Sequence, residues 1–202
     1  MIAKPLLALA GPLMLTNAQA EPRPEFDTPP VIVEVPGVAQ VMCAEGRGTA
    51  FRTGSHAYTS ANHVTSLTDC TIDGDPIETT FASKPLDFSS NRVATGGDYH
   101  RINCEGFKSG RTYVAVGYAR GTAPLQRATA VHLAGFMDAA LFAWSDFTVL
   151  TGEGRFIPGQ SGAPVFDAET YEVVGIVKGF SSGGMISYAR DLSTTPLCTG
   201  HE

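Results

Sequence analysis

Short apolar runs separated by turn residues recur along the whole chain of 202 residues. The clearest example is residues 111–118, where apolar and polar positions alternate as they do along a half-buried strand. No apolar pattern with a helical period is long enough for a major helix, and the sequence has no internal repeat. Glycine (22 residues) and proline (13 residues) are frequent, which fits many short strands joined by turns. The pattern therefore predicts an all-β barrel or sandwich. The other predicted strands are residues 31–35, 38–43, 56–60, 128–133, 139–143, 165–166 and 171–177.

Composition supports a buried core and disfavours one class of partner. The chain is long enough for one domain or two small, closely packed lobes. Hydrophobic residues make up 43% of the sequence and charged residues 17%, so a sizeable core is feasible. The formal net charge is −6 and lysine and arginine do not cluster, which disfavours a nucleic-acid-binding surface. Residues 71–81 are acidic and rich in turn residues.

The N-terminus has the pattern of a secretory signal peptide. Lys4 gives a positive start, an apolar run follows over residues 6–15, and residues 18–20 form an Ala-x-Ala cleavage site. The run is too short to span a bilayer, and a retained N-terminal anchor is the alternative. We expect residues 1–20 to be removed and the protein to be secreted or periplasmic, with no membrane segment afterwards. Residues 21–35 would follow as an extended leader that contains several prolines.

Four cysteines remain after the signal peptide, and an even number in an exported chain predicts two disulfides. They are Cys43, Cys70, Cys104 and Cys198. Three pairings are possible, and the sequence does not choose among them. The chain has no Cys-x-x-Cys, His-Glu-x-x-His or His-x-x-Glu-His pattern, so neither a redox pair nor a metal site is predicted. No cofactor is expected.

The most informative loop is residues 157–166, in which Gly159 lies two residues before Ser161 and Gly162 directly follows it. Such a loop ahead of an apolar strand holds a hydroxyl outward with free backbone N–H groups beside it. A nucleophilic serine needs that exposure and those donors, and it also needs an imidazole to take its proton. His63 lies where a predicted strand ends and a short helical turn begins, which is a rigid place for a base.

Three segments in this order resemble motifs of the trypsin/chymotrypsin-like serine proteases. The likeness is closest to the compact bacterial branch, which includes the glutamyl endopeptidases and the Deg-type periplasmic proteases. The resemblance covers residues 36–190 and implies two antiparallel six-stranded β-barrels with the active site in the cleft between them. We expect the first barrel within residues 36–109, and the second barrel with a tail within residues 110–202. The segments are residues 48–51 (Gly-Thr-Ala-Phe), 58–64 (Tyr-Thr-Ser-Ala-Asn-His-Val) and 159–165 (Gly-Gln-Ser-Gly-Ala-Pro-Val).

The resemblance also implies catalytic roles. Ser161 would be the nucleophile, and His63 the general base and then the general acid. The backbone N–H groups of Gly159 and Ser161 would form the oxyanion hole. The third member of the triad fixes the tautomer of the imidazole and stabilises the imidazolium. Asp87 fits the pattern of that residue, and Asp98 is the alternative.

Two positions depart from the family pattern. Gln160 stands where trypsin-like enzymes carry an acidic residue that pairs with a freed N-terminal amine in the zymogen. That activation route is therefore not expected here, as in much of the bacterial branch. Ala163 replaces a glycine, and its small side chain is expected to be tolerated.

The resemblance places three residues beside the substrate: Arg155, Val177 and Gly179. Arg155 lies six residues before Ser161, where the trypsin branch carries the acidic residue at the base of its first pocket. An inward arginine would favour acidic side chains through paired hydrogen bonds, and a solvent-exposed arginine is the alternative. The segment 177–179 lacks the histidine of glutamyl endopeptidases, so a small or apolar residue before the scissile bond is the default.

The sequence therefore predicts a secreted or periplasmic serine endopeptidase that acts on a polypeptide. One alternative is a catalytically silent protein of the same fold that binds a peptide or protein partner. Another is a small structural β-protein whose motifs match by chance. The oligomeric state does not follow from the sequence.

Overall fold

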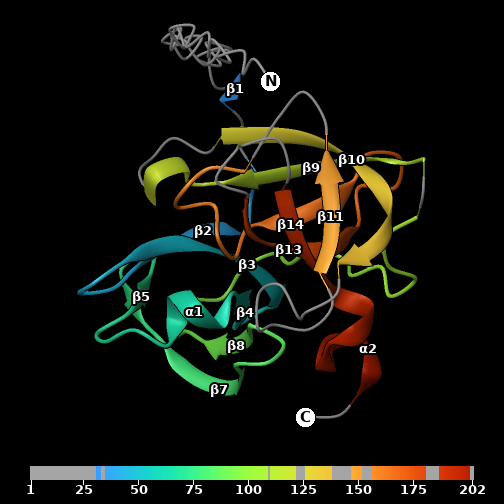
Figure 1. Cartoon of the computed structure of the whole chain (residues 1–202). Helices are drawn as coiled ribbons and strands as arrows, with labels where there is room; N and C mark the ends of the chain where they lie inside the picture. The colour runs from blue at the N-terminus through green and yellow to red at the C-terminus, as the bar shows by residue number, and fades with distance from the viewer. Residues whose placement is uncertain are drawn as a thin grey trace, which may run out of the picture.

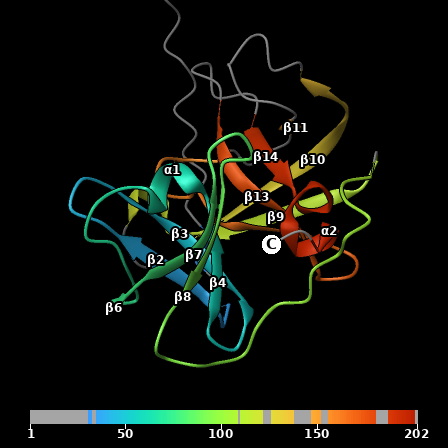
Figure 2. The same ribbon diagram turned by 90° about the horizontal axis from the view of Figure 1, so that it is seen from below.

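Two seven-stranded antiparallel sheets lie side by side in the computed structural model (Figures 1 and 2). The structure describes residues 31–32, 35–108, 110–121, 126–137, 147–151, 156–180 and 187–200. The predicted signal peptide, most of the predicted leader and the predicted strand 139–143 lie outside these residues. Within them, no helix is both long and apolar enough to cross a bilayer.

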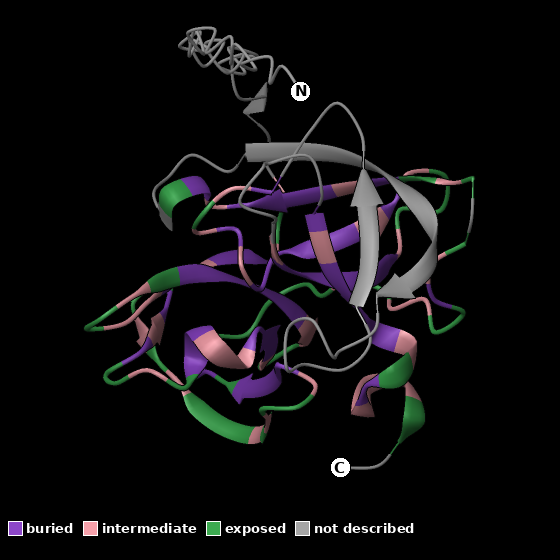
Figure 3. Ribbon diagram, in the orientation of Figure 1, coloured by how far each residue is buried: buried purple, intermediate pink, exposed green. Residues whose placement is uncertain are grey.

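The first sheet has the strand order β6-β5-β2-β3-β4-β8-β7. Predicted strands 38–43 and 56–60 correspond to β2 and β4. The acidic segment 71–81, which the sequence marks as turn-rich, instead contributes three strands; its β7 is an exposed edge strand with few apolar positions to signal it (Figure 3). The bounds are β2 Val38–Met42, β3 Arg47–Gly54, β4 Ala57–Ser60, β5 Thr71–Ile72, β6 Asp75–Pro76, β7 Glu78–Ser83 and β8 Phe88–Arg92.

The second sheet has the strand order β1-β10-β11-β14-β13-β12-β9, and β9 also pairs with β10. The hydrogen-bonded ladder therefore runs from β9 through the other five long strands and returns to β9. Predicted strands 111–118 and 128–133 fall on β9 and β10, and Val31–Ile32 of the predicted leader pair with β10 as β1. The other bounds are β9 Thr112–Gly117, β10 Gln126–Met137, β11 Phe147–Thr151, β12 Pro164–Asp167, β13 Val173–Phe180 and β14 Ser187–Asp191.

The two sheets give the trypsin-like two-barrel architecture that the resemblance implies. The second sheet curls until its ladder closes. In the first sheet, the described strands form no ladder between β6 and β7, so the sheet curls without closing. Four short helical segments complete the described elements: α1 Asn62–Thr65, η1 Ala119–Gly121, η3 Leu192–Thr194 and α2 Pro196–Thr199.

A shared apolar core joins the two sheets. Phe51 and Phe88 of the first sheet pack in one cluster with Val173 and Ile176 of the second, and all four are fully buried. Apolar burial of this kind stabilises a fold by about 25 cal/mol per Å² removed from water. The common core therefore fixes how β13 of the second sheet lies against the β7–β8 end of the first.

The structure resolves the disulfide pairing that the sequence leaves open. Cys43 bonds to Cys70 within the first sheet region, and Cys104 bonds to Cys198 of α2. The second bond links the segment between the two sheets to the end of the chain, across a sequence separation of 94 residues. Two disulfides are typical of a periplasmic or extracellular protein.

Candidate active site

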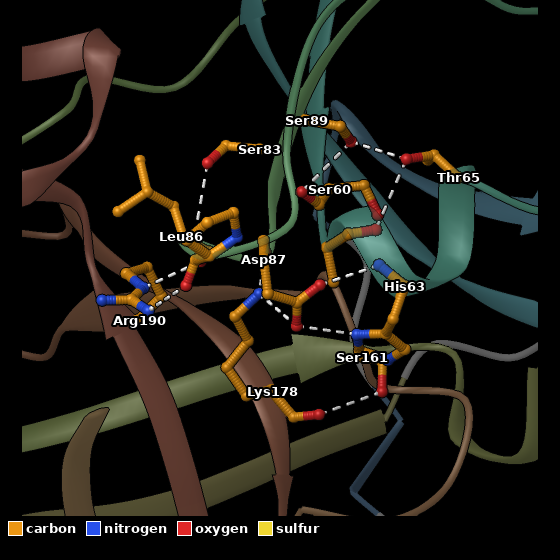
Figure 4. A network of polar contacts seen from close by, with 12 residues as sticks. Ser60, His63, Thr65, Ser83, Leu86, Asp87, Ser89, Ser161, Lys178 and Arg190 are labelled. Atoms are coloured by element: carbon orange, nitrogen blue, oxygen red, sulfur yellow. Dashed lines mark hydrogen bonds and ion pairs between the residues drawn. The ribbon is translucent and has the colours of Figure 1, made fainter. Parts of the chain in front are cut away.

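His63 is mounted on the short helix α1, directly after β4. Val64, the next residue, is buried in the core of the first sheet and anchors this turn. The His63 side chain stays 36% exposed. Its Nδ1 lies 2.8 Å from Oδ2 of Asp87, and its backbone N–H donates to Oδ1 of Asp87 at 2.7 Å. The Asp87 carboxylate therefore contacts both the ring and the backbone of the same histidine and fixes the position of its side chain (Figure 4).

Asp87 lies in the turn between β7 and β8, and its backbone N–H donates to the carbonyl of Lys84. Its φ is 47°, a left-handed conformation that aspartate tolerates better than most residues. Its side chain is only 2% exposed, and the following Phe88 is buried in the shared core. Asp98, the other candidate, is exposed on a loop beyond β8, where its backbone carbonyl faces Gly37. The structure thus brings Asp87, and not Asp98, to the imidazole.

Lys178 of β13 is a buried cation at this site that no sequence motif identifies. Its Nζ lies 2.6 Å from Oδ2 of Asp87, the same oxygen that contacts His63, and it also donates to the backbone carbonyl of Asp87. Its side chain is 4% exposed. The only signal in the sequence was a lysine inside an apolar strand.

Ionisation at this site follows from burial and charge. Burial alone would raise the pKa of Asp87, but the hydrogen bond from His63 and the charge of Lys178 outweigh it and hold that pKa below its ordinary value. Burial lowers the pKa of Lys178 to about 7; Asp87 opposes this shift and Arg190 adds to it. The aspartate is therefore a carboxylate at neutral pH, and the lysine titrates near neutrality.

Ser161 lies in the loop before β12, and its Oγ donates to the carbonyl of Lys178 at 3.3 Å. Its own carbonyl accepts the N–H of Thr49 at 2.9 Å. The next residue, Gly162, has φ 87° and no room for a side chain, because a Cβ would meet Ser60 Oγ and the backbone around Ala61. The serine loop is therefore packed on the segment that leads into His63. Figure 4 shows Ser161, Lys178, Asp87 and His63 in one connected polar network.

The turn before Ser161 orients a backbone donor. Gln160 N donates to Ile157 O at 3.1 Å around Pro158 and Gly159, and Gly159 has φ 91°, which is the pattern of a type II turn. The carbonyl of Pro158 accepts the N–H of Arg120. Because the peptide bond is planar and trans, the N–H of Gly159 points away from Arg120.

Gln160, which stands where trypsin-like enzymes carry an acidic residue, stabilises the turn before Ser161. The residue is 1% exposed, and its Oε1 accepts the N–H of Ile157 at 3.0 Å. This contact closes the turn from inside the loop. Ala163 is fully buried in the core of the second sheet, as its small size allows.

The residues expected to contact substrate are placed differently from one another. The Val177 side chain is buried in the core of the second sheet. Its backbone N–H donates to the carbonyl of Ala163 and its carbonyl accepts the N–H of Gly162, both at 2.9 Å, so its backbone is already engaged within the protein. Gly179 is half-buried, and a Cβ there would meet no atom within 4 Å, so this position is open. Arg155 lies outside the described residues. Within the described ranges, no cluster of three or more histidine, cysteine, aspartate or glutamate side chains is arranged to hold a metal ion.

Comparison with known proteins places the fold. No protein-family model and no curated protein sequence matches the chain. Solved structures do match it. The Rv3671c protease from M. tuberculosis in its active form is 19% identical, with a TM-score of 0.63 over 83% of this chain and 82% of that one. The HtrA-type protease AlgW with a tripeptide is 17% identical, with a TM-score of 0.66 over 82% of this chain and 61% of that one. The MamO protease domain from Magnetospirillum magneticum is 14% identical, with a TM-score of 0.62 over 78% and 92% of the two chains. The chain therefore has the fold of the trypsin-like serine proteases.

Proposed function

We propose that this protein is a serine endopeptidase that hydrolyses polypeptides through an acyl-enzyme on Ser161. The observation that carries the proposal is the double contact of Asp87 with the ring and the backbone of His63. Ser161 lies at the same site, where its Oγ donates to the carbonyl of Lys178, the residue whose ammonium contacts Asp87. A buried carboxylate on Nδ1 fixes the imidazole tautomer in which Nε2 is the proton acceptor.

The reaction would proceed by general base and then general acid catalysis. As Ser161 Oγ forms a bond to the scissile carbonyl carbon, its proton moves to Nε2 of His63, and Asp87 stabilises the imidazolium. The same proton then passes to the leaving amine as the peptide bond breaks. A water molecule, deprotonated by His63, releases the acid product and restores Ser161.

Negative charge develops on the scissile carbonyl oxygen when Ser161 attacks, and hydrogen-bond donors in the serine loop must stabilise it. The N–H groups of Gly159 and Ser161 are the proposed donors, and each is worth about 3 kcal/mol of transition-state stabilisation. Support comes from the type II turn, whose Pro158 carbonyl is held by the Arg120 N–H and turned away from the Gly159 N–H. Gly179, which is open, is the proposed contact for substrate on β13.

The proposed substrate is a polypeptide outside the cytoplasm. Two disulfides support an oxidising compartment, and the signal-like residues 1–20 support export. AlgW, which shares the fold, was crystallised with a tripeptide. We propose that the end of β13 near Ser161, which continues past the residues that pair with β12, binds an extended peptide in the same general way.

A fluorophosphonate probe tests the proposal, because it reacts only with an activated serine. We expect labelling of the wild-type protein and none of Ser161→Ala or His63→Ala, with all three showing the same thermal unfolding. A folded wild-type protein that is not labelled would contradict the proposal and favour a catalytically silent protein that binds a peptide or protein partner.

A further inference from the structure

We propose that Lys178 is a positioning residue that acts on His63 through Asp87. In this proposal its ammonium fixes the carboxylate and withdraws part of its negative charge from the imidazolium, so that β13 sets the pH range in which the site works. The inference rests on the proposed function, because it concerns how the same triad is tuned.

The first support is the sharing of one oxygen. Oδ2 of Asp87 lies 2.8 Å from Nδ1 of His63 and 2.6 Å from Nζ of Lys178. Oδ1 is engaged separately by the backbone N–H of His63. The ammonium and the imidazolium therefore compete for the same negative charge at the same atom.

The second support is a clamp on the turn that carries Asp87. Arg190 of β14 donates through Nε to the carbonyl of Leu86 at 2.9 Å and through its guanidinium to that of Pro85 at 3.3 Å. Lys178 donates to the carbonyl of Asp87 itself. Two cations from the second sheet thus hold three consecutive carbonyls of the first sheet (Figure 4).

Three charged or titratable side chains among the described residues surround the Lys178 ammonium. Asp87 faces it from the β7–β8 turn, Arg190 lies near it on β14, and His63 lies beyond the carboxylate on α1. Asp87 is the only anion in this group. The Asp87 carboxylate therefore has to serve both the Lys178 ammonium and the imidazolium that forms on His63 during catalysis.

Burial gives the clamp a pH dependence. The pKa of Lys178 is lowered to about 7, chiefly by burial. Over the acidic range in which an imidazole normally titrates, Lys178 is charged and opposes protonation of His63. A neutral side chain at this position would remove that opposition and let the imidazole hold its proton to higher pH.

The test is an NMR titration of the His63 ring in the full chain, assigned by its loss in His63→Gln. Lys178→Met removes the charge with little change in volume, and Lys178→Gln removes the charge but keeps a donor. We expect the His63 titration midpoint to rise by about one pH unit in both. Lys178→Arg keeps the charge and should not raise the midpoint. Lys84→Met, an exposed lysine on the same turn, is the matched control and should leave it unchanged.

A purely structural lysine gives a different result. In that case, both neutral variants would titrate at the wild-type midpoint, even if their stability fell, and the inference would be overturned. The acidic limb of kcat/KM should move with the NMR midpoint. Because the ring titrates whether or not peptide bonds are cleaved, fluorophosphonate labelling of the wild-type protein reports separately on the proposed function.

Discussion

Replacing Asp87 with asparagine would place its NH₂ group, a hydrogen-bond donor, against another donor at the centre of the site. One carboxylate oxygen accepts the backbone N–H of His63 at 2.7 Å, and the other accepts its Nδ1 at 2.8 Å and Nζ of Lys178 at 2.6 Å. An asparagine offers one acceptor and one NH₂ group. In one orientation the NH₂ faces the ammonium of Lys178, and in the other it faces the backbone N–H of His63.

Two losses of known size follow. With the NH₂ toward the ring, His63 is driven into the wrong tautomer, which costs about 10⁴-fold in kcat. The Lys178 ammonium, 4% exposed, loses its ion pair with Asp87, and an uncompensated buried charge costs on the order of 3 kcal/mol of unfolding free energy.

The stability loss has a defined pH dependence. Unfolded lysine binds its proton up to a pKa of about 10.5, whereas folded Lys178 releases it near 7 and at still lower pH without Asp87. The extra penalty in the variant relative to the wild type is therefore complete at low pH, where both folded lysines are charged, and it is absent above about pH 7, where both folded lysines are neutral. Asp87→Asn should be destabilised more at about pH 5.5 than at about pH 9 relative to the wild type.

The assays are the rate of fluorophosphonate labelling and urea unfolding at the two pH values. Asp98→Asn is the matched control, since it changes an exposed aspartate in the same half of the chain and should alter neither quantity. Labelling of Asp87→Asn within tenfold of the wild-type rate, or a loss of labelling in Asp98→Asn, would refute the reasoning. A stability gap that does not depend on pH would refute the assignment of the charge to Lys178.

Two further predictions concern the frame around the site. Replacing Cys104 and Cys198 together by serine should lower the unfolding free energy by about 4.7 kcal/mol, from the 94-residue separation that the bond closes, as measured by urea unfolding; a loss below about 1 kcal/mol would contradict it. Gly162→Ala should abolish labelling or folding, because its Cβ would meet the carbonyl of Thr49, whereas Gly110→Ala, with a similar positive φ and open space, should only lose the stability due to backbone strain. Equal effects of the two glycine changes would show that the contact is unimportant.

Much of the candidate site could be predicted because its residues lie in short local motifs. His63 follows a strand and begins a helical turn, and Ser161 lies in a glycine-bounded loop. The backbone conformation at each of these two residues is therefore determined by the residues next to it in the sequence. The family resemblance points to Asp87 through a local pattern of the same kind, although it leaves Asp98 as the alternative. Strands with clear alternation, such as 111–118, were also predictable for this reason.

What could not be predicted depends on contacts between distant parts of the chain. Lys178 lies 91 positions from Asp87, and nothing in the local pattern of β13 shows that it crosses the β7–β8 turn. The pairing of Cys104 with Cys198 is likewise set by how the end of the chain docks. Exposed edge strands such as β7 lack the apolar alternation that identifies a strand.

The claim at the centre of this account is that Ser161 becomes covalently acylated. Brief reaction with a p-nitrophenyl ester, acid quenching and mass spectrometry of the digested protein measure this directly. The account predicts an acyl group on the peptide that contains Ser161 in the wild-type protein and none there in His63→Ala. An unmodified Ser161 in folded wild-type protein, or an acyl group found only elsewhere, would contradict it.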